Sequence, residues 1–302
     1  MSEPSHAARR KKFWSDAGLF YCAAIWGSTF IVTKGALDSV NPVVMVGIRF
    51  AISAALLLPW ALKRPKFTAH LKEGVVLSVF LAALYLTQTV GLVYTTASNS
   101  GFITGLFIIF IPVFMFALRR QRPSRLEAVS AALAICGLWL LTGGVKGGNL
   151  GDALTLIAAA AYSVHLIFTD KYVKRNADTV LLAFHQFWCV SLISFAIVLF
   201  KGYPLAVAGL GGWGVILFLA VFPTLTAFYI QMLAQKESEP FKVGLIFTLE
   251  PVFAAIFAWT WGGEDFIMMK AAGGVLIVSG MLIGEFAKFN FRRAAKKEVL
   301  PV

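Results

Sequence analysis

Only a few ionisable side chains fall inside the long apolar stretches of this sequence, and they limit the chemistry open to it. Arg49, His165 and Glu250 are three of them. An ionisable side chain in such surroundings is costly and is expected to face a protein interior. Arg49 keeps its positive charge, so it can bind a ligand carboxylate, pair with an acid or donate to backbone carbonyls. Glu250 can take up and release a proton whose movement is coupled to that of a solute. It can also pair with Arg49 or accept hydrogen bonds from backbone amides exposed beside Pro251. His165 is either a second coupling candidate or a packing residue.

Aromatic and amide side chains recur at helical spacing near these groups. Trp26, Thr29 and Thr33 follow the spacing i, i+3, i+7 and share one helix face. Ring surface combined with amide groups suits an amphipathic solute, although bundle packing and interhelical hydrogen bonds would also explain the pattern. Our candidate substrate-binding residues are Trp26, Thr29, Thr33, Arg49, Tyr85, Gln88, Tyr162, His165, Phe228 and Gln231.

The sequence contains no pattern typical of a catalytic or metal site. Cys22, Cys136 and Cys189 lie in apolar stretches without metal-ligand spacing, which is typical of packing thiols. No His-Glu-x-x-His, Gly-x-Ser-x-Gly or nucleotide-binding motif occurs. We therefore expect no enzyme activity, no metal, no cofactor and no direct use of ATP. A channel is the remaining alternative, but neither a filter-like loop nor a ring of charges is evident.

The apolar stretches themselves call for a bilayer. The chain has 302 residues, of which 59% are hydrophobic and 14% charged, whereas about a quarter of the residues of a soluble domain are charged. A membrane-spanning helix needs about 20 mostly apolar residues. We therefore predict an all-α integral membrane protein with ten transmembrane helices at residues 15–36, 42–61, 73–93, 98–118, 125–143, 151–170, 179–200, 210–234, 241–261 and 268–287.

Lys and Arg residues are concentrated in every second connection between these predicted helices, and therefore on one side of the membrane. The N-terminus, the even-numbered connections and the tail hold nearly all of the 27 Lys and Arg residues. The other side carries only Lys34, Lys146, Lys201 and Lys270. Loops rich in Lys and Arg face the cytoplasm, so we expect both termini there and a multi-pass location in an inner or plasma membrane. Because the charge of +12 is spread over separate loops, we expect no nucleic-acid partner.

The second half of the chain repeats the first. The clearest match pairs Gly105-Leu106 and Pro112-Val113-Phe114 with Gly244-Leu245 and Pro251-Val252-Phe253. With five spans in each half, the second half enters the membrane inverted, which is typical of carriers with a midplane site. Three further alignments keep the same order along the chain: Trp26, Thr29 and Thr33 with Tyr162, His165 and Thr169; Arg49-Phe50 with Gln186-Phe187; and Tyr85 and Gln88 with Phe228 and Gln231.

This repeat sets the expected domain organisation. We expect a basic cytoplasmic N-terminus, two five-helix repeats joined by a linker and a basic cytoplasmic tail, at residues 1–14, 15–143, 144–150, 151–287 and 288–302. Pro112 and Pro251 lie at matching points of the two repeats. Each removes a helix hydrogen bond and favours a kink, so we expect both to act as hinges.

Several of these motifs resemble those of the drug/metabolite transporter superfamily, in particular ten-helix exporters of the EamA type. The resemblance rests on Ala24 to Phe30, Arg49-Phe50, Leu249 to Phe253 with Gly263-Glu264, and Gly273-Gly274 to Gly280. The chain departs from the repeat pattern at Ile111, which stands where the second half has Glu250. It is similar in length and helix count to bacterial aromatic amino acid exporters.

The resemblance implies a secondary transporter that works by alternating access. We expect export of small amphipathic metabolites, most of all amino acids including aromatic ones. The partners would be the small-molecule substrate and the lipid bilayer, and the chain would act as a monomer. A multidrug or other metabolite exporter of the same superfamily is the alternative function; a channel or an intramembrane enzyme is more remote.

Overall fold

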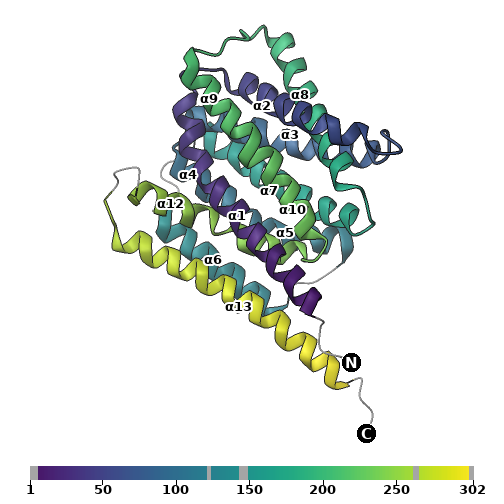
Figure 1. Ribbon diagram of the computed structural model, residues 1–302. Helices are drawn as coiled ribbons and strands as arrows, with labels where there is room; N and C mark the ends of the chain where they lie inside the picture. The colour runs from purple at the N-terminus through teal and green to yellow at the C-terminus, as the bar shows by residue number, and fades with distance from the viewer. Residues whose placement is uncertain (1–5, 121–123, 143–148, 261–264, 299–302) are drawn as a thin grey trace.

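The computed structural model describes residues 6–120, 124–142, 149–260 and 265–298. Within these ranges the secondary structure is helical throughout, apart from one isolated bridge between Val40 and Val207. Figure 1 shows the helices gathered in a bundle, with α1 crossing its middle and the end of α13 projecting from it. The helices are α1 (His6–Ala36), α2 (Pro42–Leu62), α3 (Leu71–Tyr94), α4 (Ala97–Gly105), α5 (Phe107–Arg119), α6 (Arg125–Thr142), α7 (Leu150–Val173), α8 (Thr179–Lys201), α9 (Gly209–Leu219), the π-helix η1 (Ala220–Thr226), α10 (Ala227–Gln235), α11 (Pro240–Phe247), α12 (Glu250–Thr260) and α13 (Met268–Glu298).

Local sequence explains where several helices begin and end. The Asn41 side chain accepts from the Val43 amide, and Pro42 takes the first position of α2, where its missing N–H costs nothing. Asp178 caps α8 by accepting from Val180 and Leu181 at 2.8 and 3.2 Å. These caps place the helix ends close to the predicted boundaries.

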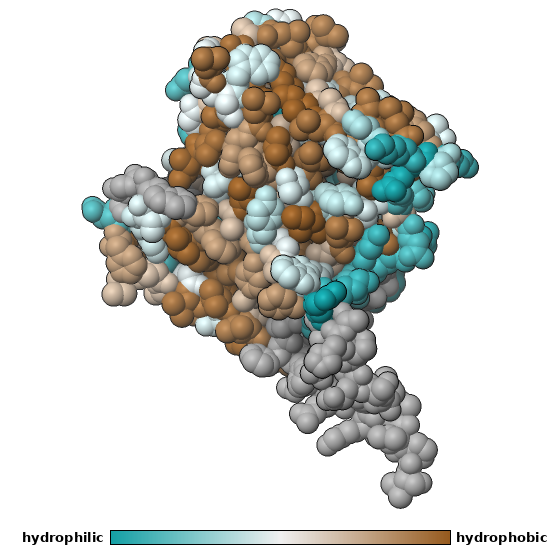
Figure 2. Space-filling view, viewed as in Figure 1, coloured by the Kyte–Doolittle hydropathy of each residue, from teal (hydrophilic) through white to brown (hydrophobic). Residues whose placement is uncertain are grey.

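Among the described residues, eight helical stretches are long and apolar enough to cross a membrane. They are Arg10–Ala36, Pro42–Leu62, Leu71–Tyr94, Asn99–Leu118, Leu150–Val173, Thr179–Lys201, Gly209–Gln235 and Pro240–Phe257. A ninth apolar stretch, Met268–Ile283, is shorter. Large apolar side chains such as Phe200, Leu210 and Val275 are exposed, and Figure 2 shows apolar surface over much of the visible face. Exposed apolar surface on this scale fits contact with lipid. The chain is a multi-pass membrane protein.

Three of the predicted spans are not continuous α-helices. The predicted span 98–118 is interrupted at Leu106, between α4 and α5. The span 241–261 is interrupted at Thr248 and Leu249, between α11 and α12. The span 210–234 contains η1, with Pro223 inside it. The two predicted hinges differ in their distance from the nearest helix break. Pro112 lies inside α5, several residues after the break at Leu106, whereas Pro251 lies in the first turn of α12, directly after the break at Thr248–Leu249.

The helices pack mostly between the two halves of the chain. α2 packs on α8, α3 on α7 and α8, and α6 on α13, while α1 contacts α10 and α12. The fully buried rings at the centre belong to Phe50, Phe107, Phe187, Phe228 and Phe247. Because α1 runs between helices of the second half, its polar face meets residues far away in sequence. Some of these residues line a pocket between the helices.

Candidate functional site

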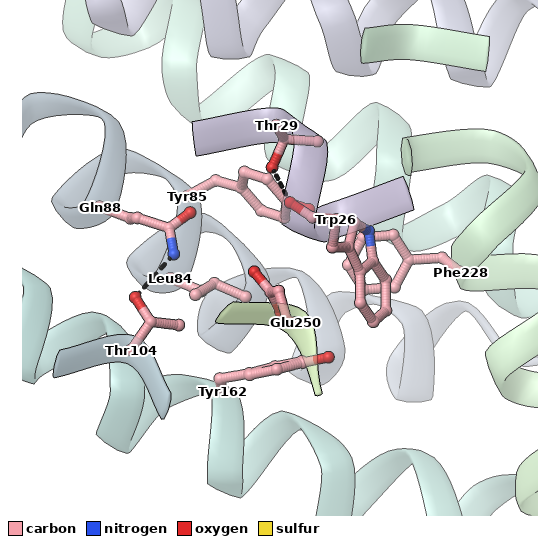
Figure 3. A pocket seen from close by; sticks show the side chains of 9 residues that line it. All are labelled: Trp26, Thr29, Leu84, Tyr85, Gln88, Thr104, Tyr162, Phe228 and Glu250. Carbon is pink, nitrogen blue, oxygen red and sulfur yellow. Dashed lines mark hydrogen bonds between the residues drawn. The ribbon is translucent and has the colours of Figure 1, made fainter. Parts of the chain in front are cut away.

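A small buried pocket lies where α1, α3, α4, α7, α10 and α12 meet (Figure 3). Its lining residues are Trp26, Thr29, Leu84, Tyr85, Gln88, Thr104, Tyr162, Phe228 and Glu250. The cavity measures about 30 Å³, roughly the volume of one water molecule in the liquid. The structure therefore brings together predicted residues from both halves of the chain, but with little room between them.

Aromatic rings form most of one wall. The Trp26 indole Nε1 donates to the Pro223 carbonyl at 2.7 Å, which fixes the ring. Ring centroids of Phe247 and Phe228 lie 4.9 and 5.3 Å from that of Trp26, and the Tyr162 centroid lies 6.1 Å away. The Tyr162 hydroxyl has no hydrogen-bond partner among the described residues. This wall is therefore rigid and apolar, with one free hydroxyl.

The Pro223 carbonyl that accepts from Trp26 belongs to the π-helix η1. Side-chain hydrogen bonds stabilise the backbone of this helix. Proline has no N–H to donate to the Leu219 carbonyl, and the Thr224 hydroxyl donates there instead at 2.7 Å. Ser53 donates to the Ala220 carbonyl at 2.8 Å. The π-helix η1 thus replaces lost backbone bonds with bonds from its own hydroxyls, from α2 and from the pocket residue Trp26. Such single-turn π-segments are frequent at functional sites.

The opposite wall is polar. The Gln88 amide Nε2 donates to the Thr104 hydroxyl at 3.0 Å. The Thr29 hydroxyl donates to the Trp26 carbonyl at 2.7 Å, within its own helix. Gln88 and Thr104 come from α3 and α4, so their bond links two elements of the first half across the pocket edge (Figure 3).

Glu250 supplies the carboxylate of the pocket. It is the first residue of α12 and is 7% exposed. Its side chain has no hydrogen bond or ion pair with any other described residue. Figure 3 shows the carboxylate pointing among Trp26, Tyr85 and Tyr162. Gly27 permits this approach, because a Cβ atom there would lie 2.5 Å from the Glu250 carbonyl oxygen.

Arg49 lies behind the pocket and does not line it. Its Nε donates to the Thr224 hydroxyl, and its Nη2 donates to the Tyr85 hydroxyl at 3.3 Å. The guanidinium carbon lies 4.4 Å from the Tyr85 ring centroid, a cation–π contact. No ion pair between Arg49 and Glu250 is present in the described part of the chain. Of the possibilities open for Arg49, the structure therefore shows a hydrogen-bonded hub rather than an acid–base pair.

Three further candidates also lie outside the lining. His165 is fully buried and its Nε2 bonds Gln186 Oε1 at 3.0 Å, behind the ring of Phe228. Gln231 is likewise buried and donates to Gln235 at 2.9 Å. Thr33 is buried one turn beyond Thr29. The helix faces that carry the pocket residues therefore continue beyond the two ends of the pocket.

Sequence reasoning missed two lining residues, Leu84 and Thr104. Thr104 carried a signal, since it is a hydroxyl inside an apolar span just before Gly105. Leu84 carried none, because an apolar residue beside Tyr85 is ordinary in a span. The described residues contain no group of three or more potential metal ligands. Gly263 and Glu264, part of the sequence resemblance, lie outside the described residues.

The fold is a helical bundle with membrane-spanning helices and a pocket of aromatic and polar side chains between them. The model of the EamA-like transporter family matches residues 13–143 and again residues 149–284. The chain belongs to this family, whose transporters act on small-molecule substrates within a lipid bilayer.

Similar proteins carry transporter names. An "Uncharacterized transporter" of Archaeoglobus fulgidus is 32% identical over 276 residues, covering 90% of this chain and 86% of that protein. A "Probable amino-acid metabolite efflux pump" of Salmonella typhimurium is 26% identical over 288 residues, covering 90% and 94%. A crystal structure with 18% identity superposes with a TM-score of 0.74, covering 93% of this chain and 98% of the other. This last likeness shows a common fold.

Proposed function

We propose that the chain is a secondary carrier that exports small amphipathic metabolites, most of all amino acids including aromatic ones, across an inner membrane. The observation that carries this proposal is the pocket in which rings, an amide and a carboxylate meet inside a family transporter. The name of the Salmonella typhimurium relative supports amino acids as the substrate class. The same mixed lining would also accept amphipathic drugs, so multidrug export is the second candidate function.

We further propose ten spans in two inverted repeats with both termini in the cytoplasm. The double match of the family model supports the repeats. So does the packing, because the contact of α3 with α7 and that of α10 with α1 are equivalent when the two halves are exchanged. The contacts of α2 with α8 and of α6 with α13 would then each join equivalent helices. α6 and α13 are the two elements that bring the count to ten.

The size of the pocket supports alternating access as the proposed mechanism. Ligand pockets usually measure about 300–1,000 Å³, far more than the cavity of about 30 Å³ here. The pocket must therefore widen to admit a metabolite. The irregular backbone at Leu106, at η1 and at Thr248–Leu249 supports motion at these points, with Pro112 and Pro251 as the proposed hinges. Thr33, Arg49, His165 and Gln231 would reach substrate only in the widened state.

Proton coupling, where it operates, is proposed to act on Glu250 rather than on His165. Glu250 faces the pocket, whereas His165 is bonded to Gln186 behind the ring of Phe228. A group that faces the substrate can exchange its proton with the side to which the pocket is open. The absence of a nucleotide-binding motif in the sequence supports a carrier driven by gradients.

Transport in proteoliposomes tests the proposal. Labelled phenylalanine, leucine, threonine and a cationic drug are assayed in parallel, with and without a pH gradient. Trp26→Phe and Gln88→Leu each remove one hydrogen bond of the pocket, so we expect phenylalanine flux to fall roughly tenfold, the equivalent of about 1.4 kcal/mol.

The matched control is Trp60→Phe, because Trp60 is exposed on α2. The phenylalanine flux of this variant should equal that of the parent protein. Movement of the drug alone would favour the multidrug exporter. Undiminished flux in both pocket variants would remove those residues from the site, and no flux of any compound would contradict the carrier proposal.

A further inference from the structure

We infer that the pocket recognises the ammonium end of its substrate, with Glu250 as counter-ion and the surrounding rings as a cage, so that it accepts aryl and alkyl ammonium compounds even when they lack a carboxylate. The inference rests on the proposed carrier function and deepens it. It identifies the ammonium group as the part of the substrate that the pocket binds most strongly, and Glu250 as the residue that binds it.

The first argument is the charge balance of the pocket. Glu250 is the sole acid among the lining residues, and the lining contains no Lys, Arg or His. No described residue pairs with its carboxylate. A buried carboxylate without a partner is strongly disfavoured, so Glu250 either takes up a proton or binds a cation. A cationic ligand supplies the missing charge, whereas an anionic ligand adds a second negative charge to the same small space.

The second argument is the geometry of the rings. Trp26, Tyr85 and Tyr162 surround the Glu250 carboxylate in Figure 3, and Phe228 adds a fourth ring to the lining. The faces of such rings attract ammonium groups, most strongly where water is excluded. The Tyr162 hydroxyl, which lacks a partner among the described residues, can accept from a substrate N–H. The cage and the carboxylate therefore favour the same ligand group.

The third argument concerns the opposite end of a zwitterion. A cation binds a substrate carboxylate most strongly, and Arg49 is a cation that contacts the lining residue Tyr85. Its guanidinium is held by Thr224 and covered by the Tyr85 ring, outside the pocket lining. The Gln88 amide donates one of its two N–H groups to Thr104, so it offers a carboxylate a single neutral donor. The pocket thus recognises the ammonium group strongly and the carboxylate weakly, and an amine should bind at least as well as its amino acid.

A matched ligand series in detergent or nanodiscs tests this inference. Phenylalanine, phenethylamine, 3-phenylpropionate and phenethyl alcohol share one ring and differ in charge. We measure binding by calorimetry and competition against labelled phenylalanine flux. We expect phenethylamine to bind at least as tightly as phenylalanine. We expect 3-phenylpropionate to bind at least tenfold more weakly, and the neutral alcohol to fall between them.

Glu250→Gln supplies the matched variant, because it keeps the shape of the side chain and removes its charge. We expect the preference for phenethylamine over phenethyl alcohol to disappear, while the alcohol binds as before and shows that the pocket is intact. Glu250→Asp keeps the charge and should retain the preference. If the Glu250→Gln protein no longer binds phenethyl alcohol, the Glu250→Asp protein becomes the test. Loss of the preference for phenethylamine over phenethyl alcohol in Glu250→Asp would count against the inference.

Two results would overturn the inference. One is equal binding of 3-phenylpropionate and phenethylamine to the parent protein; the other is an undiminished amine preference in Glu250→Gln. With phenylalanine flux present, either result removes the ammonium site and leaves the carrier standing. With no flux or binding of any amino acid or amine, the carrier proposal for these substrates fails as well.

Discussion

At the scale of single residues, Tyr85 connects the pocket to the buried cation behind it. Its side chain lines the pocket, while its hydroxyl accepts from Arg49 and its ring lies 4.4 Å from the guanidinium carbon. Phe50 packs edge-on to the same ring, with centroids 5.0 Å apart. The ring is therefore the larger part of the support that Arg49 receives from α3, and the hydroxyl the smaller part.

Substitutions at Tyr85 should separate these two contributions. Tyr85→Phe removes one long hydrogen bond, so we expect the free energy of unfolding to fall by about 1 kcal/mol. Tyr85→Leu also removes the ring beneath a desolvated cation, which adds about 2 kcal/mol. Thermal unfolding in detergent measures both. Tyr94→Phe, at an exposed position of the same helix, is the control and should melt like the parent protein; equal losses for Phe and Leu at position 85 would contradict this account.

At the scale of elements, the close approach of α1 and α12 places Glu250 in the pocket. A Cβ atom at Gly27 would lie 2.5 Å from the Glu250 carbonyl oxygen and 3.0 Å from the Ala254 amide nitrogen. These are backbone atoms, so no side-chain rotation relieves the contact. The absence of a side chain at Gly27 is therefore a condition for the position of α12.

Two Gly→Ala substitutions on the same helix should have opposite effects. Alanine favours a helix over glycine by about 1 kcal/mol, and a Cβ atom added at Gly35 would have no neighbouring atom within 4 Å. Gly35→Ala should therefore leave stability equal or slightly raised. Gly27→Ala should lower the melting temperature and reduce phenylalanine flux, because the start of α12 must move. Melting curves and proteoliposome flux are the measurements, and a Gly27→Ala protein as stable and active as Gly35→Ala would refute the argument.

At the scale of the whole molecule, charged contacts gather at the end that carries the basic loops. Lys242 pairs with Asp16 at 2.8 Å, Lys174 with Glu239 at 3.0 Å, and Arg64 with Asp178 at 3.1 Å. These pairs join α1 to α11, the end of α7 to the start of α11, and the end of α2 to the start of α8. At the other end of α1, Lys34 donates to the carbonyls of Leu92 and Thr95. The charge asymmetry of the sequence is therefore also an asymmetry of the folded molecule.

Cysteine labelling should reveal how this asymmetry sits in the membrane. In a background with Cys22, Cys136 and Cys189 replaced by alanine, Tyr203→Cys should react with an impermeant maleimide in intact cells. Lys66→Cys should react only after permeabilisation, because basic loops stay in the cytoplasm. Both positions lie in connections between helices. The reverse pattern would place the termini outside, and labelling of both sites in intact cells would contradict the proposed number of crossings.

The sequence by itself determined the helical ranges and most of the pocket. Length, hydropathy and caps such as Asn41 and Asp178 act locally, so the described parts of the predicted stretches are helical, apart from breaks at Leu106 and at Thr248–Leu249. Polar residues at membrane depth must face the protein interior, and helical spacing groups them by face. Trp26, Tyr85 and Glu250 were therefore recognisable before any packing was known.

Only the tertiary structure decided which part of each face meets the pocket. Thr33 and Gln231 follow the same spacing as Thr29 and Phe228 but lie beyond the lining, because helix rotation and the depth of each crossing depend on packing between the two halves. Arg49 is held behind Tyr85 by a hydroxyl from η1, and that π-helix arises from Pro223 together with side chains of α1 and α2. Contacts between residues so far apart in sequence are set by how helices fit against one another, and local periodicity does not encode that fit.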